Sequence, residues 1–184
     1  MMEYDEVIFE AKEFFVKSSY RNRCEVVGPN GKQILSIQIK KGKNKKRLYQ
    51  DVEITFDHRW NHIHWYALMS NYRSSPYFEF YEDILEPYFT KEYSSLFEFN
   101  IELFELVNKL LSLNIKHSLT KEFHKEVAED TEDCRSYFMP NKAFETEEFK
   151  EYIQVFSSKV GFFPNLSILD LLFCEGPNAI NFLK

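Results

Sequence analysis

The sequence Lys17-Ser-Ser-Tyr-Arg-Asn-Arg-Cys24 joins two apolar stretches that are typical of β-strands. In an extended chain, residues two positions apart point to the same side, so Arg21 and Arg23 are predicted to form a pair of neighbouring guanidinium groups. Arginine binds carboxylate and phosphate groups bidentately, and Tyr20 and Asn22 can add hydrogen bonds from the opposite face. The stretch therefore predicts an anion-binding site. The alternative interpretation is a solvated strand edge whose arginines form surface salt bridges.

A β-hairpin is predicted directly after this stretch, with strands at residues 24–27 and 33–40. The turn Gly28-Pro-Asn-Gly31 contains an Asn-Gly pair, which supplies the positive backbone angles that a tight turn requires. Apolar residues alternate along the second strand, so one face is expected to lie on the core. These residues are Leu35, Ile37 and Ile39.

Further strands are predicted at residues 6–11 and 13–16, before the hairpin, and at residues 52–56, after it. The basic run at residues 40–47 has two interpretations, a phosphate-binding loop and a solvated hairpin tip. A phosphate-binding loop normally leads into a helix N-terminus, whereas this run leads into another predicted strand. The solvated tip is therefore favoured.

The hydrophobic period changes at Trp60, and residues 60–72 are predicted to form a largely buried helix with His64 beside Trp60. His64 is interpreted either as a buried structural histidine or as a catalytic base. His62 and His64 point in different directions on a helix, so no metal site is predicted there.

Three more helices are predicted from their N-terminal signals, and residues 120–148 are predicted to form loops. The signals are Ser75-Pro76, the capping pair Ser95 and Glu98, and the capping pair Ser167 and Asp170.

The order of these elements predicts an α+β fold in one domain over residues 1–184. We expect a small, mostly antiparallel sheet, or a mixed one, from the N-terminal third, packed against several helices. Of the 184 residues, 44% are hydrophobic and 28% are charged, which is typical of a globular protein. The three cysteines are far apart in sequence, which favours free thiols and argues against a zinc site.

Charge and hydropathy exclude several function classes. The net charge of -6 argues against nucleic-acid binding. No stretch is apolar over the length that a membrane span requires, and no signal peptide follows Met1, so a cytoplasmic location is expected. The sequence does not identify a cofactor.

Several motifs along the chain resemble the WbqC-like protein family, and together they cover nearly the whole sequence. They are Lys17-Ser-Ser-Tyr-Arg-Asn-Arg-Cys24, Asn30-Gly31, Leu35-Ser-Ile-Gln-Ile39, Trp60, His64-Trp65, Tyr72, Ser75-Pro-Tyr-Phe-Glu79, Tyr81, Asp133 with Arg135, Tyr152-Ile-Gln-Val-Phe156, and Asn165-Leu-Ser-Ile-Leu-Asp-Leu-Leu-Phe173 before Gly176-Pro177.

The resemblance implies a bacterial cytoplasmic protein linked to the synthesis of surface polysaccharide such as O-antigen. It implies an acyl or aminoacyl transferase that adds glycine or a similar group to a nucleotide-linked amino sugar. In this hypothesis Arg21 and Arg23 bind the diphosphate or the charged end of the donor. His64 deprotonates the attacking amine, and Cys24 forms a thioester. The alternative interpretation of Cys24 is a packed apolar residue of the strand. The remaining residues expected to bind the substrate are Tyr20, Asn22, Trp65, Asp133 and Arg135.

Two other hypotheses use fewer of these residues. The first is a non-catalytic protein that binds an anionic small molecule, such as a nucleotide sugar or an acyl carrier, and that needs neither His64 nor Cys24. A His64 that is wholly buried and hydrogen-bonded away from Arg21 and Arg23 would favour it. The second is a structural partner in a membrane-associated assembly, which a large exposed aromatic patch would favour.

The sequence departs from the family pattern in three places. Relatives usually begin with an additional strand and helix that carry a Tyr-Phe-Pro-like run, and this chain starts after that segment. A site built partly from it is expected to be incomplete. Gln38 stands where relatives favour proline, and Cys174 stands where asparagine is common, so Cys174 is a poor candidate for a nucleophile.

Overall fold

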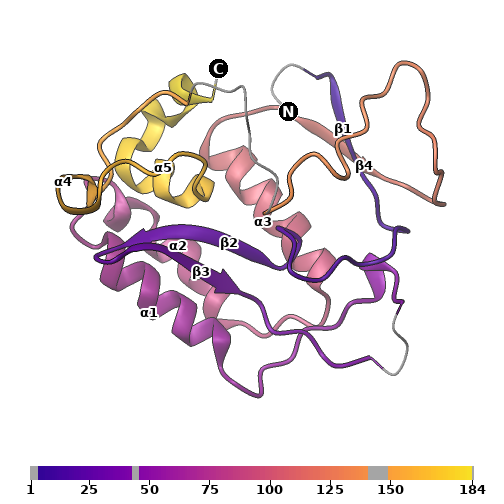
Figure 1. Cartoon of the computed structure of the whole chain (residues 1–184), viewed down its shortest axis with the longest axis horizontal. Coiled ribbons are helices and arrows are strands. Elements are labelled where there is room, and N and C mark those ends of the chain that lie inside the picture. The colour runs from indigo at the N-terminus through magenta and orange to yellow at the C-terminus, as the bar shows by residue number, and fades with distance from the viewer. Residues whose placement is uncertain (1–3, 43–45, 141–148, 184) are drawn as a thin grey trace. The chain divides into compact units, whose positions relative to one another are not determined.

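The computed structural model describes residues 4–42, 46–140 and 149–183 as an α+β protein, as the sequence predicts (Figure 1). These residues group into two compact units, and each unit combines three stretches of the chain. The first contains the described residues of Met1–Asn22, Ile39–Thr55 and Tyr93–Thr146. The second contains those of Arg23–Gln38, Phe56–Glu92 and Glu147–Lys184. The expectation of one domain over residues 1–184 stays a prediction.

The first unit contains a two-stranded parallel sheet and one long helix. Strand β1 (Glu6–Phe9) pairs with β4 (Lys116–Leu119), and Phe9 lies opposite Leu119. Helix α3 (Leu96–Leu110) packs against this pair, with the Phe9 and Phe104 rings 4.9 Å apart. Strand β4 was not predicted. Its pairing with β1 is parallel, whereas the β2–β3 pair is antiparallel, so the protein contains both kinds of strand pairing.

The start of α3 confirms the predicted cap, because the Ser95 hydroxyl accepts a hydrogen bond from the Glu98 amide at 3.2 Å. Two predicted strands in this region are wrong. Residues 13–16 and 52–56 form isolated bridge pairs instead, and the short 3-10 helix η1 (Tyr49–Asp51) lies between them in sequence. A run of apolar residues is not enough for a strand when the partner strand offers only one matching pair.

The second unit contains the predicted hairpin. Strands β2 (Arg23–Gly28) and β3 (Gly31–Ser36) are antiparallel, and Gly28 pairs with Gly31 across a two-residue turn. Gly31 has a φ of 106°, which a glycine adopts without strain. Strand β3 ends at Ser36, four residues earlier than predicted, and Leu35 points into the core as expected.

Four helices and a 3-10 turn complete the second unit. Helix α1 (Trp60–Tyr72) has the predicted bounds, while α2 (Phe78–Thr90) begins three residues after the predicted Ser75 start. Helix α5 begins after Ser167, whose hydroxyl accepts a hydrogen bond from the Leu169 amide, and it ends before Gly176 as predicted. The elements are α1 (Trp60–Tyr72), α2 (Phe78–Thr90), α4 (Ser157–Val160), α5 (Ile168–Glu175) and η2 (Gly176–Phe182).

Aromatic rings form much of the core of the second unit. The Trp65 ring stacks on Phe89 at 5.4 Å and on Phe78 at 6.0 Å, and Phe78 contacts Phe173 at 5.0 Å. Trp65 is 5% exposed, and both Phe78 and Phe173 are fully buried. These contacts fix α1, α2 and α5 against one another, and β2 lies against α5.

Residues 120–140 contain no helix or strand, in agreement with the predicted loop, and residues 141–148 lie outside the described part of the chain. The predicted basic run at residues 40–47 also falls partly outside it. Within the described residues, no helix has the length and apolar character needed to cross a bilayer.

Candidate functional site

The predicted site residues are divided between the two units. Those in the first unit are Tyr20, Arg21, Asn22, Asp133 and Arg135, and those in the second unit are Arg23, Cys24, His64 and Trp65. Strand β2 begins only at Arg23, while Arg21 and Asn22 lie in a turn and a bend. The extended backbone assumed for the arginine pair therefore starts only at Arg23 and leaves out Arg21 and Asn22. The pairing of the two guanidinium groups stays a prediction.

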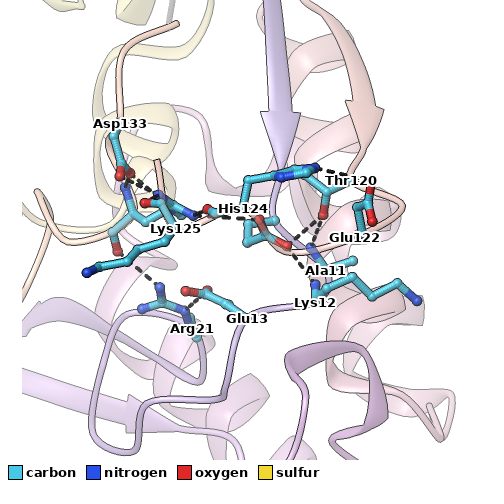
Figure 2. A network of polar contacts seen from close by, with 11 residues as sticks. Ala11, Lys12, Glu13, Arg21, Thr120, Glu122, His124, Lys125 and Asp133 are labelled. Atoms are coloured by element: carbon cyan, nitrogen blue, oxygen red, sulfur yellow. Dashed lines mark hydrogen bonds and ion pairs between the residues drawn. The ribbon is translucent and has the colours of Figure 1, made fainter. Parts of the chain in front are cut away.

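Arg21 has internal partners in the first unit (Figure 2). Its Nε atom donates to Oε1 of Glu13 at 2.6 Å, and its Nη2 atom donates to the Arg135 carbonyl at 3.0 Å. The Arg21 carbonyl accepts a hydrogen bond from Asn100 Nδ2 at 2.7 Å. The side chains of Arg21 and Glu13 are 14% and 13% exposed. Arg21 therefore holds a charge-assisted bond that a ligand would have to replace.

Arg135 is held by the loop that contains it. Its Nε and Nη2 atoms donate to the two carboxylate oxygens of Asp133 at 2.8 and 2.6 Å. It also donates to the carbonyls of His124 at 2.7 Å and Lys125 at 2.9 Å, and its guanidinium group lies 5.2 Å from the Phe123 ring centre. The hydrogen bonds that Arg135 donates to Asp133 lower the pKa of this carboxyl group to about 2.

Glu10 extends the network toward the parallel strands. Its Oε2 atom lies 3.8 Å from Nη1 of Arg135, and its Oε1 atom accepts hydrogen bonds from Thr120 Oγ1 at 2.7 Å and the Lys12 amide at 2.8 Å. The network thus contains the carboxylates of Glu10, Glu13 and Asp133 and the guanidinium groups of Arg21 and Arg135. Figure 2 labels Glu13, Arg21 and Asp133 among them. Three acids against two arginines give no surplus of positive charge for an anion.

Arg23 differs from Arg21 and Arg135. Its Nε atom is buried and has no hydrogen-bond partner in the described part of the chain. No ion pair among the described residues involves the Arg23 side chain. Arg23 is the first residue of β2, and its backbone pairs with Ser36 of β3. A buried donor without a partner is unusual in a folded protein and calls for an explanation.

Cys24 and His64 both lie in the second unit, and burial shifts both pKa values away from neutrality. Burial raises the pKa of the Cys24 thiol to about 11, although a hydrogen bond with Ser167 opposes the shift. Burial lowers the pKa of His64 to about 4, against the effect of a hydrogen bond with the backbone of Ser36. At neutral pH the thiol is protonated and the imidazole is a weak base, so neither group is activated for catalysis as it stands.

The environments of His64 and Trp65 are those of core residues. His64 is 7% exposed, and its ring meets that of Trp60 edge-on at 5.0 Å. Trp65 stacks between two phenylalanines and offers no open face to a sugar ring. Tyr20 and Asn22 are half-buried, and the Asn22 amide donates to the Ser19 carbonyl at 3.3 Å. The substrate-binding roles of these residues stay predictions.

A buried acid that the sequence analysis placed only in a helix cap lies at the centre of a second network. Asp170 is fully buried and accepts hydrogen bonds from the hydroxyls of Tyr72 at 2.9 Å and Tyr152 at 3.0 Å. The Tyr72 hydroxyl in turn accepts one from the Val27 amide of β2 at 3.0 Å. Burial raises the pKa of Asp170. An acidic residue inside the apolar run 166–173 was the available signal for it.

The described residues contain no group of histidine, cysteine or acidic side chains that could hold a metal ion. The structure thus defines an α+β protein. The first arginine of its hairpin has a buried Nε without a partner among the described residues, and the arginines of the other unit's network are paired with acids. The chain belongs to the WbqC-like protein family, whose model matches residues 1–143. No match was found among curated proteins or among solved structures.

Proposed function

We propose that this WbqC-like protein binds an anionic small molecule and that Arg23 provides the binding guanidinium group. The observation that supports this function is the buried Nε of Arg23, which has no partner among the described residues. Leaving such a donor unsatisfied costs about 1–3 kcal/mol. A phosphate or carboxylate oxygen on a ligand would recover that energy, because arginine binds both groups through two parallel hydrogen bonds.

The other two arginines are poorer candidates for the same task. An anion that binds Arg21 has to displace Glu13 from a 2.6 Å contact, and one that binds Arg135 has to displace Asp133 from two contacts of 2.8 and 2.6 Å. Arg23 needs no such exchange. The ligand class that fits the family resemblance is a nucleotide sugar or an acyl carrier, since both carry phosphate groups.

The test is a comparison of Arg23→Ala with Arg73→Ala. Arg73 lies in the same unit, its side chain is 65% exposed, and its nearest acidic atom is 3.9 Å away on Glu82. Isothermal titration with inorganic diphosphate and with uridine-diphosphate sugars measures the affinity. We expect Arg23→Ala to lose at least tenfold in affinity, about 1.4 kcal/mol, while Arg73→Ala binds as the wild type does. Equal affinities in all three proteins would overturn the proposal.

Acyl or aminoacyl transfer is the second candidate function. It is favoured by the position of Cys24, which follows Arg23 directly in β2 and whose hydrogen bond with Ser167 opposes part of the rise in the thiol pKa that burial causes. In this reaction the Cys24 thiolate attacks the carbonyl of an acyl thioester, the bond from that carbonyl to the donor sulfur breaks, and the donor leaves as its thiolate. The sugar amine then attacks the protein thioester, regenerates the Cys24 thiolate and gives up its proton to His64.

The two functions differ in what Cys24→Ser and His64→Gln do. Transfer requires an acyl adduct on Cys24, visible by mass spectrometry after incubation with an acyl thioester, and both substitutions would abolish turnover. Binding without chemistry requires that Cys24→Ser keep the affinity for diphosphate and that no acyl adduct form on Cys24. The shifted pKa values of Cys24 and His64 favour the binding function, because a thiol with a pKa of about 11 is protonated at neutral pH.

A further inference from the structure

We infer that His64 is a positioning residue for the Arg23 anion site, because it anchors through Ser36 the end of the hairpin from which Arg23 projects. The inference rests on the proposed function of Arg23. It assigns to His64 a task that needs a neutral hydrogen-bond donor and no proton transfer.

The argument begins with the strand register. Arg23 and Ser36 are Cα partners and form the terminal pair of the β2–β3 ladder, at the end opposite the Gly28–Gly31 turn. The open end of a two-stranded ribbon frays more easily than its turn end, because no further pair follows it. An arginine at that end needs an additional contact if its guanidinium group is to keep one position.

His64 provides such a contact from α1. The imidazole forms a hydrogen bond with the Ser36 backbone, and this bond favours the protonated ring, so the imidazole is the donor and the Ser36 carbonyl is the acceptor. The bond ties the last residue of β3 to a helix whose other face is packed in the core. Ser36 is thereby held opposite Arg23.

One aromatic contact orients the imidazole, and a second supports it. The Trp60 ring meets His64 edge-on at 5.0 Å, and the Phe56 ring stacks on Trp60 at 5.6 Å. His64 is 7% exposed, so water does not compete freely for its N–H group. A site whose supporting residues are locked by packing loses less conformational entropy when the ligand binds.

The experiment compares the affinity for inorganic diphosphate among four variants. His64→Phe keeps a ring against Trp60 and removes the hydrogen bond. His64→Asn and His64→Gln each restore a side-chain N–H donor. The amide nitrogen of one or the other variant reaches as far as one or the other ring nitrogen of the histidine. His62→Phe is the matched control, because His62 lies on the exposed face of the same helix. All titrations are made on folded protein, well below the midpoint of thermal unfolding.

We expect His64→Phe to weaken diphosphate binding about tenfold, as the loss of one buried hydrogen bond would, and at least one of the amide variants to restore it. Hydrogen exchange at the amides of the ladder end should speed up in His64→Phe and slow down again in the rescuing variant. Wild-type affinity in folded His64→Phe overturns the inference, and so does a loss in His64→Phe that neither amide variant reverses.

The outcomes separate this inference from the proposed function. If Arg23→Ala loses affinity and His64→Phe does not, Arg23 binds the anion and His64 is structural only. If Arg23→Ala keeps its affinity, the proposed function itself fails. Should His64→Phe not fold, the two amide variants test the inference instead. The variant whose ladder-end amides exchange hydrogen more slowly must then bind diphosphate more tightly. Affinities that do not follow this order of exchange overturn the inference.

Discussion

Nε of Arg21 lies 2.6 Å from Oε1 of Glu13, and both side chains are largely buried. This ion pair gives Arg21 a structural partner, whereas Arg23, two residues later, has none among the described residues. Two arginines that look equivalent in the sequence therefore differ in what their removal costs.

We expect Arg21→Ala to lower the free energy of unfolding by about 2 kcal/mol, because it leaves the Glu13 carboxylate largely buried without its charge partner. Arg23→Ala should keep or raise the free energy of unfolding, since it removes a buried donor whose missing hydrogen bond costs about 1–3 kcal/mol. Urea unfolding followed by circular dichroism measures both values. Similar losses in the two variants would contradict the distinction, and Arg73→Ala provides the reference for an exposed arginine.

Local signals were sufficient for much of the second unit. The aromatic residues around residues 60–72 predicted the bounds of α1. The stretch Gly28-Pro-Asn-Gly31 predicted the tight turn of the hairpin, although of the Asn-Gly pair only Gly31 has the expected positive φ. The capping residue Ser95 predicted where α3 begins. In each case the deciding contacts lie within a few residues of one another, so the sequence alone carries the information.

Long-range contacts explain what the sequence did not predict. Strands β1 and β4 are four residues each and are more than 100 residues apart, so neither shows that the other is its partner. The pairing of Arg21 with Glu13 depends on how a turn brings the two together, and no periodicity encodes it. Spacing predicted arginines that could bind an anion, but it could not show which of them are already neutralised.

His64 should make stability depend on pH in the acidic range. Its folded pKa of about 4 lies below the ordinary value of 6.5, so the unfolded chain binds more protons between these two values. Stability is therefore complete above pH 6.5 and falls as the pH drops toward 4, by about 3 kcal/mol at pH 4. Unfolding in urea at a series of pH values measures this loss.

The comparison that isolates His64 is between the wild type and His64→Phe, in which this contribution is absent. Asp170 contributes with the opposite sign, because its raised folded pKa makes its contribution fall as the pH rises through that value. Asp170 is present in both proteins and cancels in their difference. A difference that does not change between pH 7 and pH 4 would contradict the lowered pKa of His64.

The tyrosines that bind Asp170 should differ in their effect on stability. Tyr72→Phe removes the donor to Asp170 and leaves the Val27 amide of β2 without its acceptor, so we expect a loss of about 3 kcal/mol in the free energy of unfolding. Tyr152→Phe removes one donor from a half-buried position that water can reach, and we expect about 1 kcal/mol. Equal losses in the two variants would show that the Val27 contact adds no stability.

The three cysteines should react with a maleimide in a fixed order. Cys134 is exposed, whereas burial raises the pKa of Cys24 to about 11 and that of Cys174 to about 12. The thiolate is the reactive form, so only Cys134 should be labelled in the native protein at neutral pH. Its own pKa is also raised, by partial burial and by the nearby Glu132, which should make the reaction slower than that of a free thiol. Peptide mass spectrometry identifies the labelled site, and Cys134→Ser is the control that should remain unlabelled until urea is added. Rapid labelling of Cys24 in native Cys134→Ser would contradict the assignment of Cys24 as an inert thiol. That result would favour acyl transfer over binding without chemistry.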